Sequence, residues 1–389
     1  MAEVAEADVV GRYVELGLRL GRHLDGLVDA YYGPPELKAQ VDGEELVAPA
    51  QLVADAAALH GALDDGYFRD EVHGCWTFAR VLAGEELSYS DEVEGSFGVR
   101  PERTPESVFE DVHAQLDALL PGDGTLAERR RAWRDCHVCP GDIAADVLDE
   151  LLPLMRARTL GVVELPEGEH PVVEPVRDEP WWAFNYYLGD LKSRVVLNVD
   201  LPTTGLDLIH LAAHEVYPGH HTESSVKEQL LVREQGLLGQ TISMVPSPRS
   251  VLSEGIAEIG ADIVLDDESR EEAYAILRRH GVELADPELG NRISDAIDRL
   301  RTVGLNAALM IFEDGMSLDD ARDYVQHWTL NTEEQAAQSI RFVTDPTWRA
   351  YVITYSAGRE LCSAYVGGDP ARFHRLLTEQ VRVSELVGP

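Results

Sequence analysis

The chain has 389 residues, 44% of them hydrophobic, and its 70 acidic against 33 basic residues give a formal net charge of −37. This content suits a folded protein with a large core. Only Lys38, Lys192 and Lys227 are lysines, so the chain lacks the basic face that nucleic acids and anionic membranes require, and we exclude both as partners. Because molar salt shortens the screening length to about 3 Å, the acidity predicts a halophilic protein of a high-salt cytoplasm.

The first residues are acidic and have no secretory-signal pattern, and no apolar run approaches 18 residues. We therefore expect a cytoplasmic protein. The pair Cys136 and Cys139 has no second C-x-x-C partner, so it is interpreted as a reduced structural turn and not as a zinc site. The oligomeric state has no signature in the sequence.

Residues 1–31 predict a long amphipathic helix, because apolar side chains recur there every three or four positions. The polar stretch 84–103 predicts a surface loop. Proline, glycine and aspartate separate the other helices predicted in this half, which are 49–63, 66–82, 105–120, 125–136 and 141–159.

Short β-branched runs bounded by Pro, Gly and Asp predict a small sheet or ribbon over about 161–199. Its last strand, 193–199, leads into the helix with the densest group of histidines. An exposed strand there can pair with an extended peptide, and Asn198 is its candidate substrate-binding residue. Helices are predicted again at 251–264, 269–281, 287–313, 318–328, 346–366 and 370–384.

These elements predict a mainly α fold with the β element beside the histidine-bearing helix. No internal repeat or low-complexity linker divides the chain. We expect a single domain over 1–389, and two helical lobes, about 1–160 and 161–389, around a central cleft are an alternative organisation.

The string HLAAHEVYPGHH, residues 210–221, holds four of the thirteen histidines. A His-Glu pair ending an apolar helical run is typical of a zincin site, where the His binds Zn²⁺ and the Glu takes a proton from the catalytic water. Histidines near helices are more often structural, and His210 and His214 at i, i+4 fit that interpretation too. The whole string is improbable by chance, so we favour a metal site.

Pro218 stands where the common H-E-x-x-H motif has its second histidine. On a regular helix His220 lies roughly 240° around from His214, and His221 lies about 10 Å along the axis, so neither would share a metal with His214. Pro218 cannot donate to the carbonyl of His214, and Gly219 bends easily. We predict a π-type widening that makes His214 and His220 the ligands, with His221 as the alternative to His220.

A catalytic zinc site usually has three protein ligands. The stretch 253–262 offers Glu254 and Glu258 on one helical face with small residues around them. Acids at this spacing in so acidic a chain are mostly on the surface, so the prediction depends on pairing with His214. We assign Glu254 as the third ligand and Glu258 as the acceptor of a ligand histidine's second N–H.

In residues 348–359, Tyr351, Tyr355 and Arg359 recur every four positions. Tyr355 is a candidate donor to an oxyanion, and a purely structural Tyr/Arg stripe explains it equally well. Arg359 is a candidate for binding a substrate carboxylate, although a structural ion pair is the commoner role of such an arginine.

Three strings, HEVYPGHHTE (214–223), SEGIA (253–257) and YSAG (355–358), resemble a large prokaryotic family long known only as a domain of unknown function and grouped with the gluzincin-like zinc metallopeptidases. The resemblance covers most of the chain. It implies a mostly helical fold akin to carboxypeptidase Taq and angiotensin-converting enzyme. It also implies that Glu215 is the general base. The three metal ligands that it implies are His214, one of His220 and His221, and Glu254.

We therefore expect a zinc hydrolase with one Zn²⁺ per chain, acting on short peptides as a carboxypeptidase- or oligopeptidase-like enzyme. Glu215 would be its base, and Tyr355 and His221 would stabilise the oxyanion. Two alternatives stay open. The same site would act on a small non-peptide amide, or the chain would be a metal-binding helical module whose closed site uses both His220 and His221.

Overall fold

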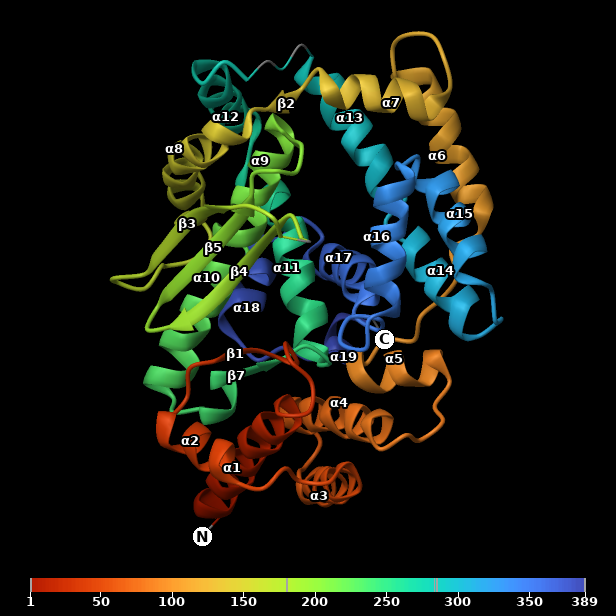
Figure 1. The fold of residues 1–389 in the computed structure, drawn as a ribbon. Helices are drawn as coiled ribbons and strands as arrows, with labels where there is room; N and C mark the ends of the chain where they lie inside the picture. The colour runs from red at the N-terminus through yellow and green to blue at the C-terminus, as the bar shows by residue number, and fades with distance from the viewer. Residues whose placement is uncertain (1, 180, 283, 285, 388–389) are drawn as a thin grey trace.

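The computed structural model describes residues 2–179, 181–282, 284 and 286–387 (Figure 1). It is 64% helix and 9% strand, which confirms the mainly α prediction. The helices are α1 (Ala2–Gly21), α2 (Pro35–Gly43), α3 (Pro49–Ala62), α4 (Tyr67–Leu82), α5 (Tyr89–Phe97), α6 (Glu106–Leu119), α7 (Leu126–Asp135), α8 (Gly141–Thr159), α9 (Gly205–Leu211), α10 (His220–Lys227), α11 (Pro248–Val264), α12 (Asp267–Arg279), α13 (Pro287–Asp298), α14 (Val303–Phe312), α15 (Leu318–Thr329), α16 (Glu333–Thr344), α17 (Val352–Val366), α18 (Pro370–Thr378) and α19 (Val383–Leu386). The π turns η1 (Ala212–Val216) and η2 (Glu228–Glu234) and the 3₁₀ turn η3 (Leu238–Thr241) complete the helical segments.

The predicted small sheet is present as β3 (His170–Val176), β4 (Ala183–Gly189) and β5 (Lys192–Asn198), in the order β3-β5-β4. Strand β5 is parallel to β3 and antiparallel to β4. The prediction that 193–199 is the exposed strand is therefore wrong, because β5 is the central strand and β4 is an edge. Two short pairs lie elsewhere: β1 (Val28–Tyr31) with β7 (Ile242–Met244), and β2 (Val138–Cys139) with β6 (Thr203–Thr204).

Three predicted elements differ from the structure. The first helix ends at Gly21, and residues 28–31 form β1, because this strand pairs with β7 more than 200 positions later. The expected loop 84–103 contains α5, which is capped by Ser88 and buries Tyr89, Val93 and Phe97. The expected helix 287–313 is two helices, since residues 299–302 form turns between α13 and α14.

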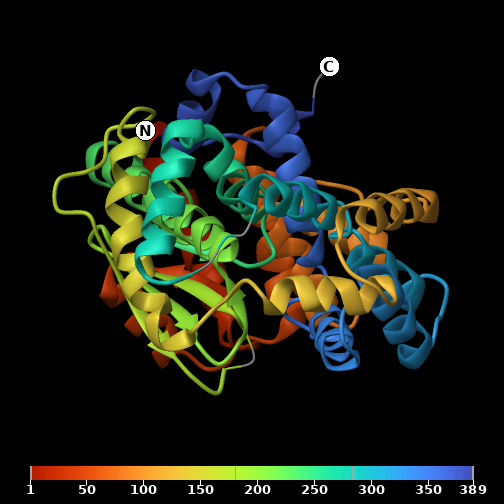
Figure 2. The same cartoon turned by 90° about the horizontal axis from the view of Figure 1, so that it is seen from above.

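The buried hydrophobic side chains form two clusters. The smaller one joins α1, α3 and α4 to Ile242 and Met244, and the larger one contains most of the other buried hydrophobic side chains. Figures 1 and 2 place the three-stranded sheet and helices α6, α7, α14 and α15 on opposite sides of the molecule. The division into lobes 1–160 and 161–389 stays a prediction.

Helices α11 and α17 cross at the centre of the larger cluster. A Cβ atom on Gly255 would lie 2.3 Å from the carbonyl oxygen of Gly358, and one on Gly358 would lie 2.4 Å from that of Val251. Only glycine permits so close an approach of two backbones. This contact sets the position of α11, which carries several residues of the site described next.

Candidate metal centre

The histidine string does not form one regular helix. Helix α9 runs into the π turn η1, where Tyr217 N donates to Ala212 O at 3.0 Å, five residues back, and Gly219 N donates to Ala213 O at 2.9 Å. The chain then leaves the helix and starts again at His220, the first residue of α10. The predicted π-type widening is therefore confirmed, and the break that follows it goes beyond the prediction.

Gly219 makes this break possible. A Cβ atom at this position would lie 1.8 Å from the carbonyl oxygen of His214 and 2.6 Å from that of Ala213. Real Cβ atoms do not approach oxygen so closely, so any larger residue would displace the backbone. As a result the rings of His214 and His220 lie with their centroids 4.8 Å apart.

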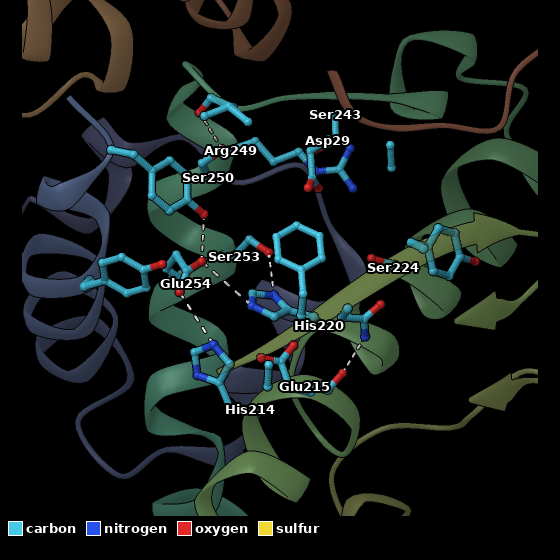
Figure 3. Close-up of a pocket in the computed structure, with 18 of the residues that line it drawn as sticks. Asp29, His214, Glu215, His220, Ser224, Ser243, Arg249, Ser250, Ser253 and Glu254 are labelled. Atoms are coloured by element: carbon cyan, nitrogen blue, oxygen red, sulfur yellow. Dashed lines mark hydrogen bonds and ion pairs between the residues drawn. The ribbon is translucent and has the colours of Figure 1, made fainter. Parts of the chain in front are cut away.

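His214, His220 and Glu254 converge from η1, α10 and α11 (Figure 3). One ligand atom from each lies within 4.8 Å of the other two. The Nε2 atoms of His214 and His220 are 3.6 and 3.8 Å from the Glu254 carboxylate oxygens. Tetrahedral zinc with bonds of about 2.05 Å separates its ligand atoms by about 3.3 Å, so small side-chain adjustments would complete the site.

The hydrogen bonding of these residues also fits a metal. His214 Nδ1 and Glu254 Oε2 are buried and have no hydrogen-bond partner in the described part of the chain. The other carboxylate oxygen of Glu254 accepts from Tyr351 Oη at 2.6 Å. Burial, and then the neighbouring His220, lowers the pKa of His214 well below its usual value, so its imidazole is neutral, as a ligand must be.

His220 is held by a chain of polar groups that the sequence did not identify. Its Nδ1 lies 3.2 Å from Ser253 Oγ, which donates to Glu223 Oε2 at 2.6 Å. Lys227 Nζ in turn donates to Glu223 Oε1 at 2.7 Å. With Nδ1 occupied in this way, Nε2 of His220 is the nitrogen directed at Glu254.

Glu258 lies one turn beyond Glu254, where the sequence placed it. Its Oε1 is 3.7 Å from His214 Nδ1, and its Oε2 is 2.7 Å from the Arg301 guanidinium. His210, His214 and Glu258 also lie within metal-binding distance of one another. The cation of Arg301 beside Glu258 disfavours a metal there, so we prefer the group that contains Glu254.

His221 does not join the cluster, which corrects its assignment as an oxyanion-stabilising residue and as the alternative ligand. It is fully buried, with Nδ1 2.8 Å from Ser193 Oγ and Nε2 2.9 Å from Glu169 Oε2. Both nitrogens are thus used to join α10 to the sheet. Tyr217 Oη donates to the same Glu169 oxygen at 2.5 Å.

The two predicted substrate-binding residues are also elsewhere. Asn198 is buried, and its amide donates to the carbonyls of Glu179 and Trp181. Arg359 donates to Glu258 O at 2.7 Å and lies near Asp262, in a different cavity from Glu215. Both assignments are corrected for one reason: their polar groups are already bonded to the protein.

The metal cluster opens into a cavity of about 130 Å³, which Glu215 and Tyr355 also line. Burial, and then the charge of Asp29, raises the pKa of Glu215 to about 8. Burial also raises the pKa of Tyr355 well above its usual value, so its hydroxyl stays protonated and can donate. Asn185 Nδ2 donates to the carbonyl oxygen of Glu215 at 2.5 Å and thereby ties β4 to η1.

Strand β4 forms one wall of this cavity through Ala183, Phe184, Asn185 and Tyr187. Asn198 N donates to Trp182 O, so the alternation of an antiparallel ladder turns the backbone groups of Ala183, Asn185 and Tyr187 away from β5. The sequence did not identify this edge strand, since the exposed strand was predicted at 193–199.

No family model matches the sequence, and no curated protein matches it. Among solved structures, the chain is similar to a protein described as the putative lipoprotein from Colwellia psychrerythraea, with a TM-score of 0.53 and 16% identity. The match covers 90% of this chain and 64% of that one, so the chain spans less than two thirds of its length. This similarity shows a shared fold alone.

A second solved structure, described as a putative lipoprotein of unknown function from Shewanella oneidensis, has 13% identity and a TM-score of 0.47. It covers 91% of this chain and 66% of that one. Among the described residues of the present chain, no helix is long and apolar enough to cross a membrane.

Proposed function

We propose that the protein is a zinc-dependent hydrolase that cleaves peptides. The observation that carries this proposal is the convergence of His214, His220 and Glu254, with Glu215 in the same cavity. Two neutral imidazoles and one carboxylate are a common ligand set for catalytic zinc, which keeps a further position for water or substrate. The unpartnered Oε2 of Glu254, which lies 3.6 Å from His214 Nε2, is explained if it faces a cation.

A bound zinc ion would act as a Lewis acid that polarises the substrate carbonyl and makes water more acidic. Glu215 lines the same cavity, and the charge of a bound zinc ion would favour its ionised form, so its carboxylate would take the proton of the attacking water and pass it to the leaving amine. Asn185 holds the Glu215 backbone in place. Tyr355 supplies a protonated hydroxyl on the cavity wall for the oxygen that becomes negatively charged.

The edge of β4 favours a peptide as the substrate over a small amide. Its outward backbone groups can form a ladder with an extended chain that crosses the cavity. The non-catalytic alternative required both His220 and His221 as ligands, and His221 instead bonds Ser193 and Glu169.

Metal analysis of single variants tests the proposal. The wild type should bind one zinc, the His214→Ala, His220→Ala and Glu254→Ala variants should lose it, and His221→Ala should retain it. Thermal melts identify any variant that fails to fold. A wild type that binds no metal when zinc is supplied would refute the proposed site.

Turnover is tested separately with Glu215→Gln. This variant keeps every ligand and should bind zinc, while its rate on a peptide substrate should fall at least 100-fold because the proton acceptor is gone. Full activity in this variant would exclude Glu215 as the base.

A further inference from the structure

Arg249 lies in the first turn of α11 and lines the same cavity as the metal cluster (Figure 3). It is 9% exposed. Within the described residues its guanidinium forms no ion pair within 4.0 Å. Nη1 donates to Gln240 O at 3.3 Å, and the Tyr32 hydroxyl is a further hydrogen-bonding neighbour. A guanidinium keeps its charge in proteins, so the cavity contains a buried cation without a paired anion.

None of the neighbouring described carboxylates forms an ion pair with the Arg249 guanidinium. Glu71 accepts from the backbone N–H of Arg249 at 3.0 Å, and Glu223 is paired with Lys227 at 2.7 Å. Asp29 lines the same cavity, where burial raises its pKa to about 6 and the charge of Arg249 opposes that rise. The two side chains lie near each other in Figure 3 but form no ion pair within 4.0 Å. The positive end of the α11 dipole, at the same place, adds to the demand for negative charge.

Unpaired buried charges are costly, so a guanidinium facing a cavity indicates a ligand that supplies the counter-charge. Two hydroxyls, of Ser224 and Ser243, line the same cavity and donate to no described residue. A carboxylate placed there would accept a bidentate pair of hydrogen bonds from Arg249 and further ones from these serines.

The position of Arg249 relative to the metal ligands defines which carboxylate this is. Arg249 precedes Glu254 by five residues on one helix, so their Cα atoms are separated by a rise of about 7.5 Å along its axis, and both residues line the same cavity. One to two extended peptide residues span about 3.5–7 Å. We propose that Arg249 binds the C-terminal carboxylate of a peptide whose scissile bond lies at the metal centre, one or two residues before its end. This rests on the proposed function and makes the enzyme a C-terminal exopeptidase.

Equilibrium binding tests the assignment without requiring turnover. In the zinc-loaded Glu215→Gln protein, calorimetry compares N-acetyl-trialanine with its C-terminal amide. The free acid should bind about 10- to 100-fold more tightly, the range expected for a buried charge-assisted pair. Arg249→Met should remove the preference, and Arg249→Lys should retain part of it because the charge remains. Arg22→Met is the matched control, since Arg22 also donates to backbone carbonyls, of Val41 and Glu44, remote from the cavity.

Equal binding of acid and amide, no binding of either, or a preference that survives in Arg249→Met would each overturn the assignment. If Arg249→Met does not fold, loss of more than half of the preference on the logarithmic scale in Arg249→Lys supports it, and an unchanged preference overturns it. An Arg249-dependent preference in a protein that hydrolyses no peptide would leave the carboxylate site intact and refute only the hydrolase.

Discussion

Replacing Gly219 by alanine tests whether the break between η1 and α10 positions the metal ligands. The new Cβ would lie 1.8 Å from the backbone carbonyl oxygen of His214. A backbone oxygen cannot avoid this contact by a change of side-chain rotamer. Overpacking of this kind costs about 3 kcal/mol, at the upper end of the usual range. An unfolding entropy of about 2.1 cal/mol/K per residue gives about 0.8 kcal/mol/K for 389 residues, so Tm should fall by about 4 °C.

The same displacement should move His220 relative to His214 and weaken zinc binding at least 10-fold, which competition with a chelator of known affinity measures. Gly61→Ala is the control: Gly61 lies within α3 with open space around it, and alanine there should stabilise the protein by about 0.5–1 kcal/mol. Unchanged Tm and zinc affinity in Gly219→Ala would refute the argument that this glycine determines the geometry of the cluster.

Three further residues and the overall charge yield predictions. Tyr355→Phe should lower kcat about 100-fold with little change in KM, because it removes a donor used only in the transition state; steady-state kinetics on a peptide measures this. Glu258→Gln should weaken zinc binding about 10-fold or more, because it removes the negative charge 3.7 Å from His214 Nδ1, and chelator competition measures this. Burial raises the pKa of Glu71 to about 7 from its ordinary value of 4.5. Because the folded state favours protonated Glu71, this group's contribution to the free energy of unfolding is fully present below pH 4.5. It is lost as pH rises through 7, and the total loss is about 3 kcal/mol. Urea melts across this range should therefore show a smaller loss in Glu71→Gln. Finally, Tm should rise between low and molar KCl, since screening weakens repulsion within a net charge of −37; equal values would argue against salt adaptation.

The sequence predicted the residues of the cluster because their signals are local. Helical phase showed that His214 and His220 could meet only if the helix widened, and Pro218 and Gly219 marked where this happens. The i, i+4 spacing of Glu254 and Glu258 likewise identified one helical face. Each of these inferences uses residues within a few turns of one another.

Residues that depend on distant partners were not predictable in this way. His221 lies in the core because it forms hydrogen bonds with Glu169 and Ser193, which lie 52 and 28 residues before it. The exposed strand is β4 because β5 pairs with β3 as well, and strand order is a property of the assembled sheet. Arg249 shows no local motif, since its missing counter-ion is apparent only when every neighbouring carboxylate has been placed.

Helix α11 unites these two kinds of residue. It carries the proposed ligand Glu254, the serine that orients His220, the carboxylate beside His214, and Arg249, all on one continuous backbone. Its position is set by the close contact of Gly255 with α17. The backbone positions of Glu254 and Arg249 relative to each other are therefore fixed by helix geometry. If the proposed carboxylate site is correct, the enzyme would select substrates by the length of chain beyond the scissile bond, because the cation and the proposed ligand Glu254 are carried by one rigid helix.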